Sequence, residues 1–297
     1  DPGDTLWISP LDKGSLVHEI LERFVLAVLD DPPTPDEPWS DAHHALLREI
    51  GGAVCDSYEG RGVVGRHLFW ARDRARILMR LDRFLHEDDA YRARTGSRPM
   101  AAEMAFGLPG ADQEPVDVAI GGERTLRFRG SADRVDLTDD GTLRVIDYKT
   151  GRPYEYRGLS PDNPDDHGTH LQLAVYGVAA RARHGRPDAP VAAEYWFVTD
   201  REALTAIGYP VTDDVLAKVG TTLATIVDGI ELGQFIARPT ASASDPYVRC
   251  RYCDPDGLGV AERRREWDRK RDDPLVHAYA ELAEPRPELP SAEAVPA

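Results

Sequence analysis

Several features that would place the chain in a common protein class are missing from its sequence. Three cysteines among 297 residues are too few for a disulfide scaffold, and they fit a reducing compartment such as the cytoplasm. No apolar run is long enough to cross a bilayer, and the first residues show no basic stretch followed by an apolar one, as a secretory signal would. A G-x-x-x-x-G-K-[ST] motif is also absent, so an ATP-driven motor would have to lie outside this chain. We therefore expect a cytoplasmic protein with no membrane segment.

The sequence also lacks a positive charge balance, since its formal net charge is −16. This argues against a broad electrostatic surface for nucleic acid, because phosphate binding requires local positive charge. Much of the acidic excess lies in 30–41, 162–166 and the tail from Glu281. By contrast, Arg61–Arg98 holds ten arginines against five acidic residues, and Arg263–Arg271 is a second basic run. Binding of nucleic acid in a local basic groove, or with the help of a basic partner, therefore stays possible.

The length suits one large domain or two small ones, and the 41% of hydrophobic residues suffices for a sizeable core. The chain begins Asp1-Pro2-Gly3 without a methionine, and we expect it to be part of a longer protein. We expect one domain over 1–275, followed by a Pro-, Glu- and Ala-rich tail over 276–297 that is disordered. The domain would consist of a helical part over 12–98, an α/β core over 99–235 and a C-terminal helical part over 236–275.

Apolar residues repeat with helical spacing in some stretches and alternate as in strands in others. The expected helices are 12–29, 41 into the fifties, 63–85, 169–183, 212–234 and one from about 260. The expected strands or extended stretches are 99–106, 116–120, 125–128, 132–137, 142–149 and 194–199. The inner face of the third helix would consist of Val64, Leu68, Ala71, Ala75, Leu78, Leu81 and Leu85. Its arginines would occupy the remaining faces, where a solvated surface and contact with a nucleic-acid backbone are equally reasonable.

The stretch from Gly130 to Gly151 has the form of a β-hairpin. Two runs rich in aliphatic and β-branched residues, 132–137 and 142–149, flank a turn at Asp139-Asp140-Gly141. A turn centred near Asp140 gives an unbulged ladder in which the numbers of opposed residues sum to 280. Asp136 then faces Arg144, and we expect these two residues to form an exposed ion pair.

The same register places Asp133 opposite Asp147 on a mostly apolar face, with Lys149 two residues further on. Like charges directly opposite in a sheet are destabilising, and the cost rises where water is excluded. A divalent cation between the carboxylates would remove the conflict, because hard cations take oxygen ligands. The alternative is that Lys149 alone neutralises the pair at a sheet edge.

Two of the expected helices carry polar residues four positions apart. His18 and Glu22 flank the apolar face of the first helix, and Gln172 and Tyr176 share a face of the helix after the hairpin. Taken alone, His18 and Glu22 are best interpreted as an ordinary polar pair beside a core stripe. Cys55, in the second helix, is best interpreted as a small buried hydrophobic residue.

Four separated motifs occur in one order along the chain. They are G-S-L-V-H-E-I-L-E-R-F at 14–24, G-S-A-D-R-V-D at 130–136, V-I-D-Y-K-T-G at 145–151 and L-Q-L-A-V-Y at 171–176. Together they resemble the RecB-like branch of the PD-(D/E)XK nuclease superfamily, which includes the nuclease domains of RecB- and AddB-type helicase–nucleases and CRISPR-associated exonucleases. In that branch a helical histidine precedes the core and a Q-x-x-x-Y helix follows the lysine. The resemblance is specific over Asp12–Tyr176 and looser as far as Arg271.

The resemblance implies a restriction-endonuclease-like α/β fold. In this fold a central mixed β-sheet, whose antiparallel hairpin carries the active site, is flanked by helices, and additional helices lie at both ends of the chain. The metal ligands would be His18, Asp133 and Asp147, joined by the backbone carbonyl of Tyr148. Such a mainly oxygen-donating site suits Mg²⁺ or Mn²⁺.

The resemblance also implies catalytic roles, in which Asp133 and Asp147 act through the metal. Lys149 would orient or activate the attacking water and stabilise charge on the phosphate. Gln172 and Tyr176 would position the substrate strand or brace the lysine. Glu103, an acid between apolar residues of the first expected strand, is a candidate for a supporting role and is left out of the site.

One part of the family pattern fails at the cysteines. Nucleases of the AddB type often hold a [4Fe–4S] cluster with one cysteine before the first motif and a C-terminal C-x2-C-x5-C. Here Cys250 and Cys253 match two positions, Gly259 stands at the third, and no cysteine precedes His18. Such a cluster needs four thiolates, so we do not expect an intact one. The remaining pair is a remnant, half of an intermolecular metal site, or simply packing.

The leading hypothesis is a metal-dependent DNA exonuclease domain of a helicase–nuclease that acts in DNA repair and recombination. Its partners would be DNA, as single strands or duplex ends, and a helicase domain or subunit. A second hypothesis is a catalytically inert nuclease-fold module that binds DNA or a helicase. A third is a stand-alone nuclease of the CRISPR-associated or restriction type. The presence of His18, Asp133, Asp147 and Lys149 together favours the first hypothesis over the second.

Overall fold

The computed structural model describes residues 6–184, 188–198, 205–236 and 260–285, and the chain divides into two compact units, Asp1–Val219 and Gly220–Ala297. The helices of the first unit are α1 (Pro10–Val28), α2 (Asp41–Gly60), α3 (His67–Thr95), the short 3₁₀ helix η1 (Pro153–Tyr156) and α4 (Gln172–Arg183). Its strands are β1 (Ser97–Phe106), β2 (Val116–Ala119), β3 (Thr125–Phe128), β4 (Gly130–Thr138), β5 (Leu143–Lys149), β6 (Val191–Phe197) and β7 (Thr205–Pro210). Helix α5 (Asp213–Glu231) begins in the first unit and ends in the second, which also contains α6 (Val260–Lys270) and α7 (His277–Ala283).

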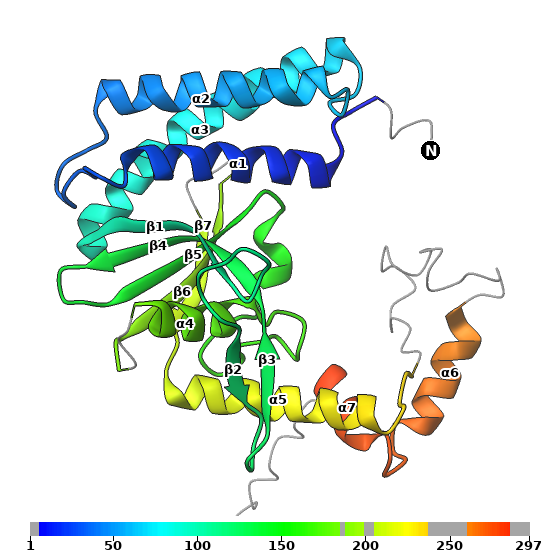
Figure 1. Ribbon diagram of the computed structural model, residues 1–297. Helices are drawn as coiled ribbons and strands as arrows, with labels where there is room; N and C mark the ends of the chain where they lie inside the picture. Colours follow the sequence, from blue (N-terminus) through cyan, green and yellow to red (C-terminus); the bar gives the residue numbers. More distant parts are fainter. Residues whose placement is uncertain (1–5, 185–187, 199–204, 237–259, 286–297) are drawn as a thin grey trace, which may run out of the picture. The chain divides into compact units, whose positions relative to one another are not determined.

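A five-stranded mixed sheet forms the centre of the first unit, with the strand order β1-β4-β5-β6-β7. All neighbouring strands are antiparallel except β5 and β6, which are parallel and are joined by a crossover through α4. Helices α1, α2 and α3 form a layer on one face of this sheet, and α4 lies on the other (Figure 1). The predicted fold class is therefore confirmed: a mixed sheet carrying an antiparallel β4–β5 hairpin, flanked by helices.

The main hydrophobic core lies between the three-helix layer and the sheet. Ile146, Tyr148 and Trp196 project from β5 and β6 and are at most 1% exposed. They pack against apolar side chains of α1, α2 and α3, which have the helical spacing expected for a buried face. Cys55 belongs to this core and is completely buried, as predicted. The burial of this face positions α1, and with it His18, over the hairpin.

Local sequence signals set the ends of the helical layer. The Ser9 hydroxyl accepts a hydrogen bond from the Asp12 amide at 3.0 Å, and Pro10 occupies the first turn of α1. Ser40 begins α2 with a reciprocal capping box, in which His43 takes the third position. Helix α3 ends at Gly96, whose φ of 63° is readily adopted only by glycine, and β1 follows at once. The first two caps fix where α1 and α2 begin, and the cap at Gly96 fixes where α3 ends and the chain enters the sheet.

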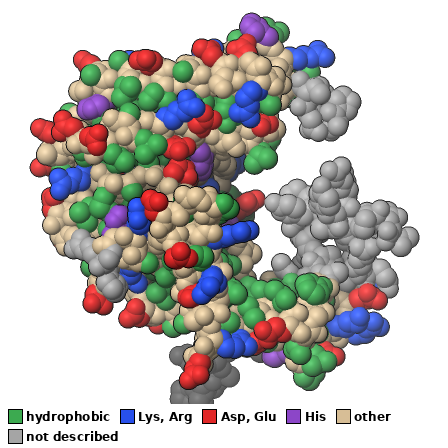
Figure 2. Space-filling view, in the orientation of Figure 1, with side chains coloured by type: hydrophobic (Ala, Val, Ile, Leu, Met, Phe, Trp, Pro, Cys, Tyr) green, Lys and Arg blue, Asp and Glu red, His purple; other side chains and the backbone are tan. Residues whose placement is uncertain are grey.

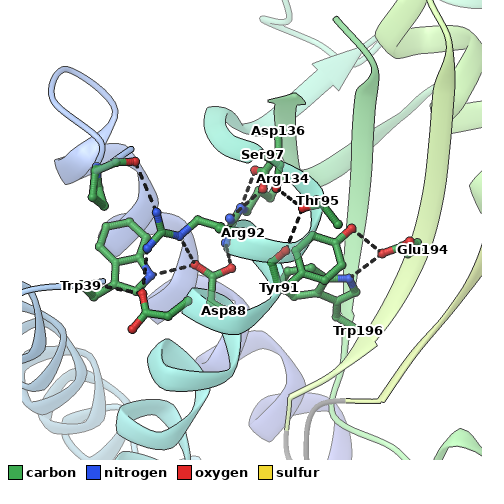
Figure 3. Close-up of polar contacts among 12 residues, drawn as sticks. Trp39, Asp88, Tyr91, Arg92, Thr95, Ser97, Arg134, Asp136, Glu194 and Trp196 are labelled. Carbon is green, nitrogen blue, oxygen red and sulfur yellow. Dashed lines mark hydrogen bonds and ion pairs between the residues drawn. The ribbon is translucent and has the colours of Figure 1, made fainter. Parts of the chain in front are cut away.

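A buried polar network joins this helical layer to β4 (Figure 3). The Arg134 guanidinium donates to Asp136 at 2.6 and 2.7 Å and to Asp88 of α3 at 2.9 Å, and all three residues are at most 1% exposed. Asp88 also accepts from Trp39 and from Arg92, whose guanidinium donates to three backbone carbonyls of the loop before α2. Each buried charge therefore has an opposite charge or a hydrogen-bond partner, as burial requires.

The predicted exposed ion pair between Asp136 and Arg144 is wrong. Asp136 is buried and pairs with Arg134, whereas Arg144 donates to Tyr91 at 2.8 Å and to Glu194 at 3.2 Å. The hairpin register itself holds, since Asp136 does face Arg144 across the ladder. The prediction failed because this face is covered by α3, which supplies Asp88 as a further partner.

Other differences concern lengths and ends of elements. Helix α3 continues to Thr95, and Leu68 is 79% exposed rather than on its inner face. Strand β7 was not anticipated from the sequence. In the stretch expected to be a disordered tail, α7 is helical, and Glu284 at its end accepts hydrogen bonds from Arg264 and Trp267. Among the described residues, no helix combines the length and apolar character needed to span a bilayer.

The buried network predicts a large stability loss when Arg134 is replaced by methionine. The change leaves Asp136 without its cation and Asp88 with one fewer, so we expect the free energy of unfolding to fall by about 3–5 kcal/mol. Urea denaturation at neutral pH measures this. Arg127→Met is the matched control, because its ion pair with Asp117 is exposed and contributes far less. Equal losses in the two variants would contradict the assigned role of Arg134.

Candidate active site

The predicted site residues come together at one end of the β4–β5 hairpin, between α1 and α4. His18 lies on α1, Asp133 on β4, Asp147 and Lys149 at the end of β5, and Gln172 and Tyr176 in the first turns of α4. Figure 2 shows acidic and histidine side chains gathered below α1 on this face. Residues more than 150 positions apart in the sequence therefore contribute to one site.

The hairpin register agrees with the one predicted from its turn. The ladder runs from Leu137 opposite Leu143 to Arg134 opposite Ile146, so Asp133 and Asp147 stand one step beyond its last pair. At that step the Asp133 carboxylate accepts a hydrogen bond of 2.6 Å from the backbone amide of Tyr148. Asp133 is 8% exposed and Asp147 is 3% exposed, so both carboxylates are largely removed from water.

A third carboxylate, Glu103, lies on the other side of Asp133. The β1–β4 ladder pairs Ala102 with Arg134 and Met104 with Ala132, which places Glu103 directly across from Asp133. The ligand atoms of His18, Glu103 and Asp133 all lie within 4.8 Å of one another. In this group His18 Nδ1 is 3.2 Å from Asp133 Oδ1, and Ser131 donates to Glu103 at 2.8 Å. The neighbouring strands β1 and β4 thus bring Glu103 and Asp133 together with His18, whereas Asp147 on β5 lies outside this close group.

Glu103 also has an unusual backbone, with a φ of 46° in the middle of a strand. A non-glycine residue in this left-handed region costs on the order of 1–3 kcal/mol, and such residues concentrate at functional sites. Sequence reasoning considered Glu103 and left it out of the site. The available signal was an acid between apolar residues of a strand, but the register between β1 and β4 could not be read from the turn chemistry of the hairpin.

Lys149 lies beside Asp147 and is held there by residues of α4 and β6. Its ammonium group contacts the Asp147 carboxylate and donates to Gln172 Oε1 at 3.1 Å. Gln172 in turn donates to the Tyr176 hydroxyl at 3.2 Å. Tyr195 of β6, which sequence reasoning missed, donates to Gln172 at 3.3 Å and places its ring 4.8 Å from the Lys149 nitrogen. The structure therefore brings Gln172 and Tyr176 to the lysine.

Burial and the charges of neighbouring groups shift the pKa values of the residues of the site. Burial raises the pKa of Asp147 to about 6; Lys149 acts to lower it, and the charge of Asp133 raises it. Burial also raises the pKa of Glu103, and Asp133 adds to this effect. Burial alone would lower the pKa of His18, but the hydrogen bond and charge of Asp133 outweigh it, so this pKa lies above its ordinary value. Each of these shifts indicates a site that favours an added positive charge.

The donor set fits a hard divalent cation. Glu103 and Asp133 offer carboxylate oxygens and His18 offers one imidazole nitrogen, a set suited to Mg²⁺ or Mn²⁺. Asp147, a predicted ligand, is not part of this close group, and its carboxylate contacts Lys149 instead. The backbone carbonyl of Tyr148 remains a predicted ligand, although its peptide is fixed beside Asp133 by the amide hydrogen bond. The predictions for Cys250 and Cys253 fall outside the described residues.

Comparison with known proteins agrees with this geometry. A family model described as the PD-(D/E)XK nuclease superfamily matches residues 5–256. The chain belongs to this superfamily. The matched range covers the site and the whole central sheet, and the assignment of the family's D…(D/E)-x-K motif to Asp133, Asp147 and Lys149 stays a prediction.

The curated relatives are each named as a subunit of an ATP-dependent helicase/deoxyribonuclease. The protein from Clostridium acetobutylicum is 27% identical over 153 residues, which is 48% of this chain and 13% of the relative. The one from Lacticaseibacillus casei is 27% identical over 206 residues, 65% of this chain and 16% of the relative. The one from Symbiobacterium thermophilum is 41% identical over 86 residues, 28% of this chain and 7% of the relative. The chain thus matches no more than about a sixth of the length of these relatives.

The position of Glu103 predicts that Glu103→Gln weakens divalent-metal binding. The amide keeps the size and the Ser131 contact but removes one negative charge, so we expect the Mn²⁺ affinity to fall roughly 10-fold or more, the scale of losses at metal-supporting residues. Isothermal titration calorimetry measures the affinity, and thermal unfolding verifies that the variant is folded. Glu123→Gln, at an exposed acid in the same unit, is the control and should bind Mn²⁺ as the parent does. Unchanged affinity in Glu103→Gln would remove Glu103 from the site.

The raised pKa values predict how metal binding depends on pH. Protons compete with a cation for Asp147 and His18, so affinity is full above their pKa values and is lost as the pH falls through them. With the pKa of Asp147 at about 6 and that of His18 above its ordinary value, the loss should be well advanced at pH 6. Calorimetry in buffers of different ionisation enthalpy should also detect protons released on Mn²⁺ binding. Affinity that is constant between about pH 5 and pH 8 would contradict this assignment.

Proposed function

We propose that this chain is a divalent-metal-dependent DNA nuclease domain that hydrolyses phosphodiester bonds as an exonuclease. The observation that carries the proposal is the placement of Lys149 beside the buried carboxylates. Its ammonium group contacts Asp147 and Gln172, and its side chain is 20% exposed, so the group is fixed in position yet accessible to a substrate. A lysine used only to neutralise a sheet edge would need neither the Gln172 contact nor the neighbouring His18 and Glu103.

The cation would be held by His18, Glu103, Asp133 and Asp147. When bound, it would supply positive charge against the negative charge that develops on the phosphate during cleavage. The chain's own residues prepare this position: Asp133 is fixed by the Tyr148 amide, and Ser131 fixes Glu103. Preorganised charge of this kind is the main source of rate acceleration in reactions that build up charge.

Lys149 would act directly on the reacting phosphate and the attacking water. Because Gln172 accepts one of its N–H groups, the ammonium keeps a defined direction and can donate another to a phosphate oxygen or to water. The Tyr195 ring on one side of the ammonium limits its alternative positions. Gln172 and Tyr176 would therefore brace the lysine, which deepens one of the two roles predicted for them.

The context would be a helicase–nuclease that acts in DNA repair and recombination in the cytoplasm. The relatives carry both helicase and deoxyribonuclease in their name, and this chain contains no P-loop motif of its own. A helicase domain or subunit would therefore deliver the DNA, as a single strand or a duplex end. Such delivery also suits an acidic chain, which would not depend on its own surface to capture DNA.

The proposal predicts that Lys149→Met abolishes Mg²⁺-dependent DNA degradation. We expect the rate to fall by at least about 100-fold, the usual scale for losing a group that stabilises charge in the transition state. Release of labelled nucleotides from linear single-stranded and duplex DNA measures the rate, with circular DNA as the test for internal cleavage. Lys218→Met is the control, because Lys218 is partly exposed and paired with Asp162 and Asp214.

Three outcomes would overturn parts of the proposal. Cleavage unchanged in Lys149→Met would remove the lysine from the mechanism. Degradation of circular DNA as fast as linear DNA would replace exonuclease with endonuclease activity. DNA binding by the parent chain without cleavage at any Mg²⁺ or Mn²⁺ concentration would favour the inert module instead.

A further inference from the structure

A second cluster of possible metal ligands lies away from the hairpin, where α2 packs on α3. It consists of His44 on α2 and of Asp82 and His86 on α3, and its ligand atoms all lie within 4.8 Å of one another. His44 Nδ1 is 2.9 Å from Asp82 Oδ1, and the rings of His44 and His86 are 4.7 Å apart between centroids. None of these residues takes part in the nuclease site.

The three residues are brought together by the packing of α2 against α3. Asp82 and His86 are four residues apart, so they lie on the same face of α3 one turn from each other. His44 projects from the neighbouring helix and is only 6% exposed. The cluster is therefore anchored by one buried imidazole and opens to solvent at His86.

We propose that His44, Asp82 and His86 form a second metal site, selective for Zn²⁺ or a similar transition metal, that links α2 to α3. Two imidazoles and one carboxylate are a donor set typical of Zn²⁺, with a fourth position for water. This set differs from the carboxylate-rich group at the hairpin, which suits Mg²⁺ or Mn²⁺. The two sites would thus bind different metals.

Arg48 opposes the binding of a cation at this cluster, because its charge lies against Asp82. Its guanidinium donates to Asp82 at 2.7 Å, and its side chain is 57% exposed. Because Arg48 reaches Asp82 from the solvent side, it can leave when a metal binds, at some loss of affinity. Removing its charge should therefore strengthen binding, whereas an arrangement that is only a polar contact between helices predicts no metal binding with or without Arg48.

The site has a structural consequence, since His86 precedes Asp88 by two residues. Asp88 holds Arg134 of β4, so a metal that links α2 to α3 would stabilise the helix that anchors the hairpin. A ligand that binds only the folded state stabilises that state, and the stabilisation grows with the logarithm of the ligand concentration divided by its dissociation constant. Tighter binding therefore gives a larger effect. Zn²⁺ should therefore raise the midpoint of thermal unfolding without entering the nuclease site.

The test is a Zn²⁺ and Co²⁺ titration of the whole chain in the presence of excess Mg²⁺, which competes for the nuclease site. The parent should bind one Co²⁺ with the visible absorption of a tetrahedral site and should unfold at a higher temperature with Zn²⁺. His86→Ala, at an exposed position, should lose at least roughly 100-fold in affinity, because removing even an outer partner of a metal ligand costs up to that much. Arg48→Gln should bind several-fold more tightly.

His67→Ala is the matched control, because His67 lies on α3 with its side chain 86% exposed and outside the cluster. It should bind Co²⁺ and respond to Zn²⁺ as the parent does. A background of Asp133→Asn with Asp147→Asn provides a second measurement in which the proposed hairpin site has lost two of its carboxylates. Equal affinity in His86→Ala and the parent, or no tetrahedral Co²⁺ absorption in the parent, would overturn the proposal.

Discussion

The buried ion pairs of Arg134 are the interactions on which the rest of the structure depends. Arg134 joins β4 to α3 through Asp88 and Asp136, and it immediately follows Asp133 in the sequence. Successive side chains of a strand point to opposite faces of the sheet. Because Arg134 is held on the face covered by the helices, the side chain of Asp133 must point the other way. Removing one partner of a buried ion pair is costly, whereas the intact pair gives little net stability. The network is therefore better understood as fixing the geometry of the hairpin than as a source of stability.

The site itself works against folding. Glu103, Asp133 and Asp147 lie on three adjacent strands, Glu103 has a strained backbone, and burial raises the pKa of Asp147 to about 6. Natural proteins accept such local conflicts at functional sites and compensate for them elsewhere. Here the compensation comes from the core under α1–α3 and from the paired charges beside it. A cation that occupies the site would relieve the same conflict that its residues create.

Much of the fold and part of the site could be predicted from the sequence, because local signals determine them. The Asp140-Gly141 turn determined the hairpin register, and helical spacing identified α1 and α4 with His18 and Gln172. What failed depends on contacts between distant segments. The burial of Asp136 required knowing that α3 covers that face, and the position of Glu103 beside Asp133 required the register of β1 against β4. Neither is encoded within one stretch of sequence.

The arginines of α3 show why a count of charges in the sequence overestimates the positive charge available to bind phosphate. The sequence left a solvated face and a nucleic-acid contact equally open for them, but several are already committed within the protein. Arg92 is completely buried, Arg74 pairs with Asp56 at 2.6 Å, and Arg83 pairs with Glu87 at 2.8 Å. Fewer of these charges are then available to attract phosphate than the sequence suggests, and the net charge of −16 opposes it further. Under the proposed function, the chain must therefore rely on the bound cation and Lys149 for the phosphate, and on its partner for capture of the DNA.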